Sequence, residues 1–348
     1  MALEEIIQAK LKQVKYPGFS RDIVSFGLVQ SVQIEKGVAV ITLSLSTNEE
    51  AVVDKLRNDI QVALEDIQEI ERFDIHILRQ AVATPAKTSP SDSQFSIPGV
   101  KHIIAVASGK GGVGKSTVAA NLACAFEQMN LKTGLCDCDM YGPSMALMFG
   151  TTENPQATED EKIVPIERYG LKLMSMGFLV DAAAPAVLRG PMVTRFTQQF
   201  LRGVVWGDLD VLILDLPPGT GDIQLTVVQN VVLTGAVIVT TPQEVALIDA
   251  RKAVGMFGKV NVKILGLIEN MSYFLCPSDG KRYDIFGSGG GKAEAEKLEV
   301  PLLAQIPIDM ATREAGDQGK PVVLRYPDMP VSRAFREAAE KIWTDFKN

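Results

Sequence analysis

A chain of 348 residues in which 46% are hydrophobic and 22% charged has the composition of roughly two globular domains, not of a disordered chain. Its net charge is −7, so the chain lacks the excess of positive charge that attracts nucleic acid or anionic lipid. The charge therefore predicts no nucleic-acid partner and no stable membrane association. Four cysteines and two histidines argue against a disulfide framework and a histidine-based metal site, and they fit a reducing, cytoplasmic compartment.

The pattern of apolar and β-rich runs in residues 1–82 predicts a small α+β domain. Apolar spacing and β-rich runs indicate, in chain order, a helix over Leu3–Val14, strands over Leu28–Ile34 and Val38–Leu45, a helix over Asn48–Ile70 and a strand over Phe73–Leu78. A short loop that contains Gly37 separates the first two strands, which is typical of a hairpin. Residues 83–98 lie in a stretch rich in Pro, Ser, Thr and Ala without an apolar period, which predicts a linker.

From residue 99 to residue 348, predicted strands and helices alternate. Six short, mostly β-branched runs are expected to be buried strands: Ile103–Ala107, Thr133–Asp137, Val211–Asp215, Ala236–Thr240, Ile264–Ile268 and Leu302–Ile306. The alternation predicts an α/β domain with a doubly wound, mostly parallel sheet, whose ligands sit beyond the carboxyl ends of the strands. Ile223–Gln243 has no charged residue, but its polar residues and Thr234-Gly235 predict a helix, a turn and a buried strand rather than a membrane span.

A phosphate-binding loop follows the first of these strands. The segment GKGGVGKST is a G-x-x-x-x-G-K-S motif between a strand and a helix. Backbone N–H groups of such a loop surround phosphate oxygens, and the helix N-terminus adds a partial positive charge. Lys115 is expected to reach the β- and γ-phosphates and Ser116 to bind Mg²⁺. The predicted ATP-binding residues are Gly109, Lys110, Gly111, Gly112, Val113, Gly114, Lys115, Ser116 and Thr117.

Three carboxylates are expected beside this loop. Asp215 ends an apolar strand in a Walker B pattern, which predicts that it holds Mg²⁺ through a water. Asp137 and Asp139 follow another strand end; Asp137 is assigned to Mg²⁺ and Asp139 to orienting the attacking water. The alternative for this pair is a polar loop with an Asp cap before a helix.

Three further segments are expected to contact the nucleotide. Gly219, in DLPPGTGD, could offer its N–H to the γ-phosphate and sense its loss. Asn270 follows a strand and can read both a donor and an acceptor on adenine, although an Asn in this position is also a common turn former. Pro307 and Asp309 follow the last strand and could flank the base.

Several segments carry a family resemblance. With its early lysine, KGGVGKST resembles the deviant Walker A loop of the MinD-like SIMIBI NTPases, in which that lysine reaches the phosphates of the partner subunit across a dimer. DCDMYGPS, LRGPMVTRFTQQFL, DLPPGTGD, TPQEVALIDARKAVGMF and ENMSYFLCP resemble the Mrp/NBP35 (ApbC) family over about residues 98–345, and residues 5–80 resemble the MIP18-type domain.

This resemblance implies an iron–sulfur cluster carrier. Such a protein is a homodimer that binds and slowly hydrolyses ATP, with Lys110 acting in trans beside Lys115 and Asp139. It would receive a labile cluster, expected to be [4Fe–4S], from an assembly scaffold and deliver it to apo-proteins. The alternatives are a dimeric ATPase switch with a protein cargo and no cluster, and a MinD- or ParA-like positioning ATPase. The last would need a basic amphipathic tail, whereas VSRAFREAAEKIWTDFKN mixes both signs of charge.

The sequence departs from the family at the cluster motif. The family's C-P-x-C becomes Cys276, Pro277, Ser278 and Asp279. The resemblance assigns Cys276 as a cluster ligand, and Asp279 as a weaker oxygen ligand in place of the second cysteine. Two other cysteines, Cys124 and Cys136, are expected in the core, and Cys138 beside the phosphate site.

Overall fold

The structure, a computed structural model, describes residues 3–14, 23–24, 28–35, 38–45, 50–67, 70, 72–79, 94–139, 142–160, 162–178 and 201–347. The chain separates into two compact units, Met1–Ser89 and Pro90–Asn348. The turn at Gly37, most of the expected linker and residues 188–200 of the LRGPMVTRFTQQFL segment lie outside the described residues.

The small unit is built on a three-stranded sheet. Its elements are α1 (Leu3–Leu11), β1 (Val29–Glu35), β2 (Val38–Leu45), α2 (Glu50–Leu64) and β3 (Arg72–Arg79). The central strand β2 pairs antiparallel with β1 and parallel with β3. The expected helix over Asn48–Ile70 is too long, because α2 ends at Leu64 and the chain turns there, with the Ile67 N–H donating to the Leu64 carbonyl at 3.1 Å. Ile67 and Ile70 are nevertheless buried, which explains why they fitted the helical spacing.

An eight-stranded sheet forms the centre of the large unit. Its strands are β4 (Val100–Ala107), β5 (Thr133–Asp137), β6 (Ile166–Arg168), β7 (Leu171–Ser175), β8 (Leu209–Asp215), β9 (Gly235–Thr240), β10 (Ile264–Glu269) and β13 (Leu302–Gln305). Their order is β13-β10-β9-β4-β8-β5-β7-β6, and every neighbouring pair is parallel except β6 with β7. The predicted doubly wound, mostly parallel sheet is therefore confirmed. The sequence did not reveal β6 and β7.

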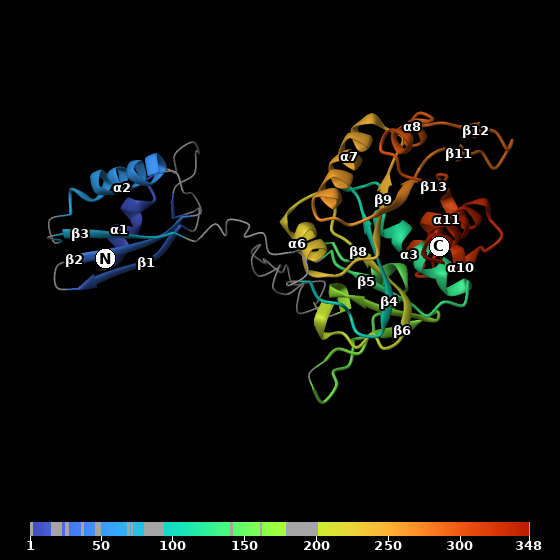
Figure 1. Ribbon diagram of the computed structural model, residues 1–348, viewed down its shortest axis with the longest axis horizontal. Coiled ribbons are helices and arrows are strands. Elements are labelled where there is room, and N and C mark those ends of the chain that lie inside the picture. Colours follow the sequence, from blue (N-terminus) through green and yellow to red (C-terminus); the bar gives the residue numbers. More distant parts are fainter. Residues whose placement is uncertain are drawn as a thin grey trace. The chain divides into compact units, whose positions relative to one another are not determined.

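Helices cover both faces of this sheet. They are α3 (Lys115–Gln128), α4 (Met145–Met148), α6 (Asp222–Asn230), α7 (Glu244–Lys259), α8 (Gly290–Lys297), α9 (Met310–Asp317), α10 (Val322–Arg325) and α11 (Pro330–Lys347), with a 3-10 turn η1 (Met176–Phe178). Figure 1 shows α6 and α7 on one face and α3, α10 and α11 on the other. All residues of β9 are buried, as two-sided coverage requires. The uncharged stretch Ile223–Gln243 divides into α6, a turn and β9, and no described helix has the length and apolarity to cross a membrane.

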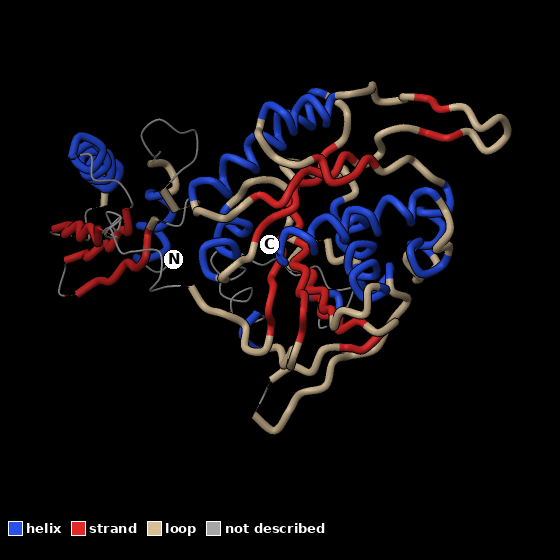
Figure 2. The backbone as a smooth tube through the Cα atoms, turned by 45° about the vertical axis from the view of Figure 1, so that its right-hand side comes forward, coloured by secondary structure: helices blue, strands red, loops and turns tan. Residues whose placement is uncertain are grey.

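A small hairpin projects from the large unit. It consists of β11 (Phe274–Leu275) and β12 (Arg282–Tyr283), and both Figure 1 and Figure 2 show it extending away from the sheet. Its root is attached to the segment after β13, because the Ile308 N–H donates to the Tyr273 carbonyl at 2.6 Å.

Two glycines bring the carboxyl-terminal ends of α4 and α9 together. Gly150 and Gly319 have φ of 59° and 71°, and a Cβ on Gly319 would lie 2.3 Å from the Gly150 Cα. The Tyr169 hydroxyl donates to the Gly319 carbonyl at 3.1 Å. The two chain segments therefore meet backbone to backbone, which only glycine allows.

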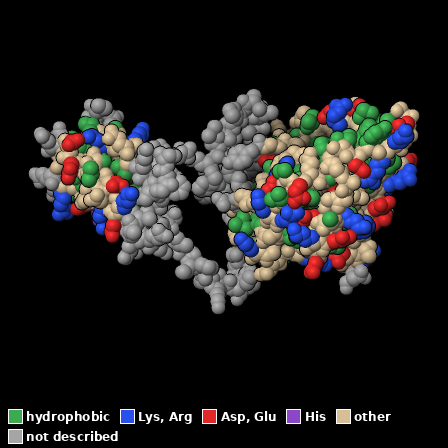
Figure 3. Space-filling model, turned by 90° about the horizontal axis from the view of Figure 1, so that it is seen from above, with side chains coloured by type: hydrophobic (Ala, Val, Ile, Leu, Met, Phe, Trp, Pro, Cys, Tyr) green, Lys and Arg blue, Asp and Glu red, His purple; other side chains and the backbone are tan. Residues whose placement is uncertain are grey.

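Charges of both signs are mixed on the surface. On the face shown in Figure 3, Lys and Arg side chains alternate with Asp and Glu over the described part of the large unit. That face has no extended patch of one sign, in keeping with the modest net charge of −7.

Candidate nucleotide site and thiol hairpin

The segment Gly109–Thr117 links β4 to α3 at the carboxyl edge of the sheet, and its last three residues form the start of that helix. Gly112 and Gly114 have φ of 79° and 80°, and a Cβ on Gly114 would lie 2.2 Å from Asn270 Nδ2. No side chain caps the first turn of α3, and that turn has no acidic residue. The amino-terminal N–H groups and the helix dipole of α3 therefore favour an anion in this cradle, which suits phosphate.

Lys115 and Asp215 form a buried ion pair under the loop. The Lys115 ammonium donates to Asp215 Oδ1 and lies 3.3 Å from Ser116 Oγ. Burial raises the pKa of Asp215, whose second oxygen, Oδ2, has no hydrogen-bond partner in the described structure. An orphaned buried acceptor costs about 1–3 kcal/mol, so a ligand that donates to it is favoured. A hydroxyl and a carboxylate side by side also fit Mg²⁺, which prefers oxygen ligands and keeps several waters.

Asp137 lies beside Asp215 at the same register on the next strand. Burial, followed by the charge of Asp215, raises the pKa of Asp137 to about 7. Asp137 Oδ2 accepts from the Ser144 N–H and the Ser175 hydroxyl, each at 3.0 Å, and Oδ1 accepts from the Asp139 N–H at 3.1 Å. The loop that carries Asp139 is thus fastened at both ends to Asp137.

Asp139 lies half-buried in that loop, and its Oδ1 accepts from the Gly142 N–H at 3.2 Å. Asp139→Ala is expected to retain ATP binding and to lose hydrolysis by about 10²-fold or more, the usual contribution of a group that activates the nucleophile. Asp139→Asn keeps an acceptor for Gly142 and should be equally slow. Phosphate release and a fluorescent-ATP titration separate the two effects, and normal turnover by Asp139→Ala would show that the residue does not orient the water.

Gly219, the residue predicted to sense the γ-phosphate, is hydrogen-bonded to the residue just before the phosphate loop. Its φ is 94°, and its N–H donates to the Ser108 carbonyl at 3.0 Å, while the Ser108 hydroxyl donates to the Lys110 carbonyl at 2.9 Å. A contact from Gly219 to a γ-phosphate therefore requires exchange of this hydrogen bond. Lys110 itself is half-buried at the start of the loop.

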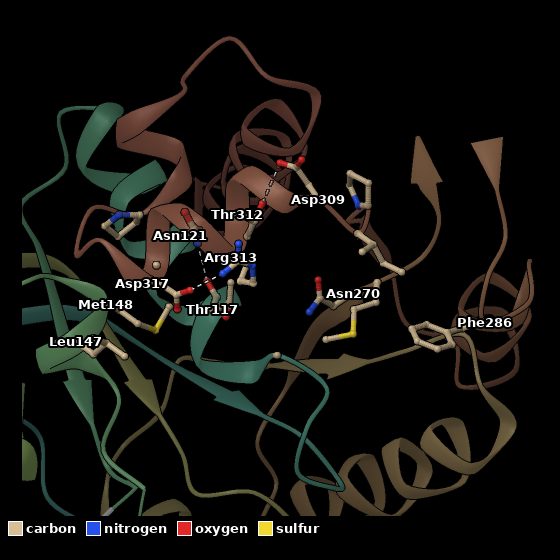
Figure 4. A pocket seen from close by; sticks show the side chains of 16 residues that line it. Thr117, Asn121, Leu147, Met148, Asn270, Phe286, Asp309, Thr312, Arg313 and Asp317 are labelled. Carbon is tan, nitrogen blue, oxygen red and sulfur yellow. Dashed lines mark hydrogen bonds and ion pairs between the residues drawn. The ribbon is translucent and has the colours of Figure 1, made fainter. Parts of the chain in front are cut away.

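A cavity of about 440 Å³ opens beside Gly114 and Thr117. Asn270 lies on its wall and donates from Nδ2 to the Val113 carbonyl at 2.8 Å. Pro307 and Asp309 also line it, and the Asp309 carboxylate caps α9 by accepting from the Ala311 N–H at 3.3 Å. Sequence reasoning missed several lining residues: Leu147, Met148, Met271, Phe286, Thr312, Arg313 and Asp317. In Figure 4, Asn270 and Phe286 lie on one side of the cavity, and Leu147 and Met148 on the other.

Cys276 lies in the turn of the projecting hairpin, away from the nucleotide loop. Its Sγ is 3.0 Å from Ser278 Oγ, and this hydrogen bond is the main cause of a lowered pKa for the thiol. Asp279, in the same turn, accepts from the Lys281 N–H at 3.0 Å, which is the main cause of its lowered pKa. The turn therefore presents a thiol of lowered pKa and a carboxylate. The described residues contain no group of three or more His, Cys, Asp and Glu side chains arranged as a metal site.

The other three cysteines are buried. Cys124 and Cys136 are core residues with no exposed surface, as expected, and burial raises the pKa of both thiols. Cys138 is 1% exposed, with its Sγ 3.9 Å from that of Cys136. The Cys138 N–H donates to the Asp215 carbonyl at 2.9 Å, so the residue lies next to Asp215, although its side chain is packed within the core cluster. That Cys138 borders a phosphate site stays a prediction.

The fold and the loop define a P-loop nucleotide-binding protein. Residues 99–343 match the profile described as NUBPL iron-transfer P-loop NTPase, and residues 4–76 match the one described as iron-sulfur cluster assembly protein. The chain belongs to the NUBPL iron-transfer P-loop NTPase family, with a domain of the second family in front.

Individual relatives agree with this assignment. The iron-sulfur cluster carrier protein of Aquifex aeolicus is 42% identical over 357 aligned residues that cover 98% of this chain and 97% of the relative. A nucleotide-binding protein of Archaeoglobus fulgidus, solved in complex with ADP, is 37% identical with a TM-score of 0.59, over 68% of this chain and 92% of that one. The cell division ATPase MinD of Pyrococcus furiosus shares the fold, with 24% identity and a TM-score of 0.52, over 70% of this chain and 98% of that one.

Proposed function

We propose that this protein is an ATP-dependent iron–sulfur cluster carrier. It binds and slowly hydrolyses ATP at Gly109–Thr117, holds a cluster at Cys276 and delivers it to apo-proteins in the cytoplasm after loading from an assembly scaffold. The observation that carries the proposal is the pairing, in one unit, of a phosphate loop with an accessible thiol of lowered pKa on a projecting hairpin. The names of the relatives support it. Residues 1–82 form the front domain, 83–98 the linker and 99–348 the ATPase domain.

The ATP site uses the residues at the carboxyl edge of the sheet. Lys115, which is the first residue of the helix after the phosphate loop, exchanges Asp215 for the β- and γ-phosphates when ATP binds, because charge-assisted hydrogen bonds to phosphate replace the one to the carboxylate. Mg²⁺, which neutralises phosphate charge when bound, would be held by Ser116 and, through water, by Asp215 and Asp137. Asp139 accepts a hydrogen bond from the attacking water and orients it. Asn270, Pro307 and Asp309 surround the base in the adjoining cavity.

The cluster is the cargo and is bound by Cys276. Thiolates are the ligands that iron–sulfur clusters prefer, and the Ser278 hydroxyl lowers the pKa of the Cys276 thiol. Two chains in a homodimer supply two thiolates, so Asp279, a small thiol or water completes the ligand set of a [4Fe–4S] cluster. Oxygen ligands bind such iron more weakly, which makes the cluster labile and suits transfer.

Anaerobic reconstitution with iron and sulfide tests the carrier function. We expect protein purified in air to be colourless and reconstituted protein to hold about two irons per chain, as one four-iron cluster shared by two chains requires. The measurements are the absorption spectrum and the iron content. Wild-type protein that takes up no iron would favour the alternative of a dimeric ATPase switch with a protein cargo.

Lys110 provides a test of the homodimer. Lys110→Ala should bind ATP, dimerise poorly and hydrolyse ATP on the order of 10³-fold more slowly, since a charge supplied in trans contributes at least that much in related sites. Sedimentation and phosphate release measure the two losses. Mixing Lys110→Ala with Asp139→Ala should recover part of the activity, because a mixed dimer has one site with Asp139 of one chain and Lys110 of the other. A mixture that stays inactive would place Lys110 in its own chain's site.

A further inference from the structure

Both ends of the Cys276 hairpin are fastened to one buried carboxylate. Glu269, at the end of β10, has no exposed surface. Before the hairpin, the Ser272 hydroxyl donates to Glu269 Oε1 at 2.6 Å; after it, the Gly291 N–H donates to Oε2. Gln305 on β13 donates to Oε1 at 2.8 Å. The root of the hairpin is thus fixed to the sheet, and since Phe274 also forms a bridge with Ile308, the freedom that remains lies between Phe274 and Gly291.

The same segment supplies one wall of the cavity beside the phosphate loop. Asn270 and Met271 line it just before the hairpin, and Phe286 lines it just after β12. Phe286 is half-buried, whereas its neighbour Ile285 is 57% exposed and does not line the cavity. Across the cavity, Leu147 on α4 is 61% exposed. Two apolar side chains therefore face a space beside Asn270 (Figure 4), an arrangement that suits a flat aromatic group with polar edges.

We propose that the base of the bound nucleotide packs against Phe286 and that this contact transmits nucleotide binding to Cys276. The proposal rests on the proposed function, since it takes this cavity as the base site and Cys276 as the cluster thiol. Packing of an aromatic side chain on a base contributes about 1–3 kcal/mol, which is enough to restrain the segment that bears Phe286. That segment continues from β12, whose residue Arg282 pairs with Leu275, the neighbour of Cys276. A restrained Phe286 therefore restrains the turn around the thiol.

The reactivity of Cys276 toward a thiol reagent can be used to measure this coupling between the base and the hairpin. All four cysteines are described, and three of them are at most 1% exposed, so Cys276 is the thiol that a reagent reaches in the folded protein. Its reactivity depends on the local conformation, because the thiol is half-buried in the hairpin turn, with its Sγ 3.0 Å from Ser278 Oγ, and a reagent must reach the sulfur there.

The test compares two ligands that share phosphates but differ in the base. Cluster-free, full-length protein is reacted with a chromogenic disulfide in the presence of saturating Mg–ADP or Mg–pyrophosphate, with saturation established by calorimetry. ADP should slow the reaction of Cys276 about fivefold or more, the lower end of typical coupling between sites, and pyrophosphate should leave it unchanged. Equal slowing by both ligands, or no slowing although ADP binds, overturns the proposal. Failure to bind ADP at all instead overturns the proposed function, and the inference with it.

Two matched variants locate the contact. Phe286→Ala, saturated with ADP through the phosphate loop, should react at the ligand-free rate. Ile285→Ala removes a neighbouring apolar side chain that does not line the cavity, and it should retain the slowing seen in the wild type. Circular dichroism checks that both variants fold. Full slowing in Phe286→Ala, or equal loss in Ile285→Ala, shows that the base does not act through Phe286.

Discussion

Lys115→Ala is expected to abolish ATP binding and hydrolysis together. The ammonium is buried under the loop and is expected to pair with the phosphates of bound ATP, and removal of one partner of a desolvated, hydrogen-bonded charge pair across a binding interface costs about 2–5 kcal/mol or more. Since each 1.4 kcal/mol is tenfold, ATP affinity should fall at least about thirtyfold. The loss is expected in binding as well as turnover, because the proposed role of Lys115 is to contact the phosphates before any chemistry. Calorimetric titration with ATP measures it directly.

Lys110→Ala is the matched control for this variant, since it removes the other lysine of the same loop. It should bind ATP with an affinity close to that of the wild type. Thermal unfolding of Lys115→Ala shows whether the protein remains folded with Asp215 unpaired. If Lys115→Ala binds ATP as tightly as Lys110→Ala does, the loop does not hold the nucleotide through this lysine.

Cys276→Ala is expected to eliminate iron uptake during anaerobic reconstitution. The remaining cysteines are at most 1% exposed, so no thiolate would be left at the surface to bind iron. Iron content per chain and the cluster absorption measure the loss. Ser278→Ala is the control, because it keeps the thiol and removes the hydrogen bond that lowers its pKa. It should take up iron only at higher pH than the wild type, since the thiolate then forms at higher pH.

Asp279→Cys tests the same turn by adding a cluster ligand instead of removing one. It restores a second thiolate per chain, so that two chains supply four, and the reconstituted cluster should survive exposure to air for longer than that of the wild type. Iron uptake by Cys276→Ala equal to that of the wild type would remove the chemical basis for cluster binding at this hairpin, whatever Asp279→Cys does.

The sequence predicted the main sheet because its central strands are buried on both faces. The six expected strands correspond to β4, β5, β8, β9, β10 and β13; five of them lie inside the sheet and are mostly buried, and the sixth, β13, lies at its edge but still begins with an apolar run. The edge strand β6 is only three residues long, with one residue buried, and it carries no such signal. The hairpin strands β11 and β12 have two residues each, too few for any alternation to be read.

The parts of the candidate site that were predictable are those in which the binding of phosphate requires particular residue types at a fixed spacing within one short segment. The phosphate loop and Asp215 follow such patterns, and the structure brings Lys115 and Asp215 together, although the roles assigned to these residues stay predictions. The cavity was not predictable in this way, because Leu147, Phe286 and Arg313 come from separate segments that meet only in the fold. The distances between them in the sequence therefore form no motif from which a ligand site could be predicted. The burial of Cys138 likewise depends on packing that follows the end of β5, not on the sequence around it.

The glycine pair that joins α4 to α9 bears on how the cavity can deform. Both helices contribute lining residues, Leu147 and Met148 from one and Thr312 and Arg313 from the other. Because Gly150 and Gly319 meet backbone to backbone, the ends of those two helices have no room to approach each other further. The opposite side of the cavity includes Phe286, on a hairpin that is fixed only at its root. Closure of the cavity around a ligand is therefore expected to move the hairpin that carries Cys276 more than the two helices.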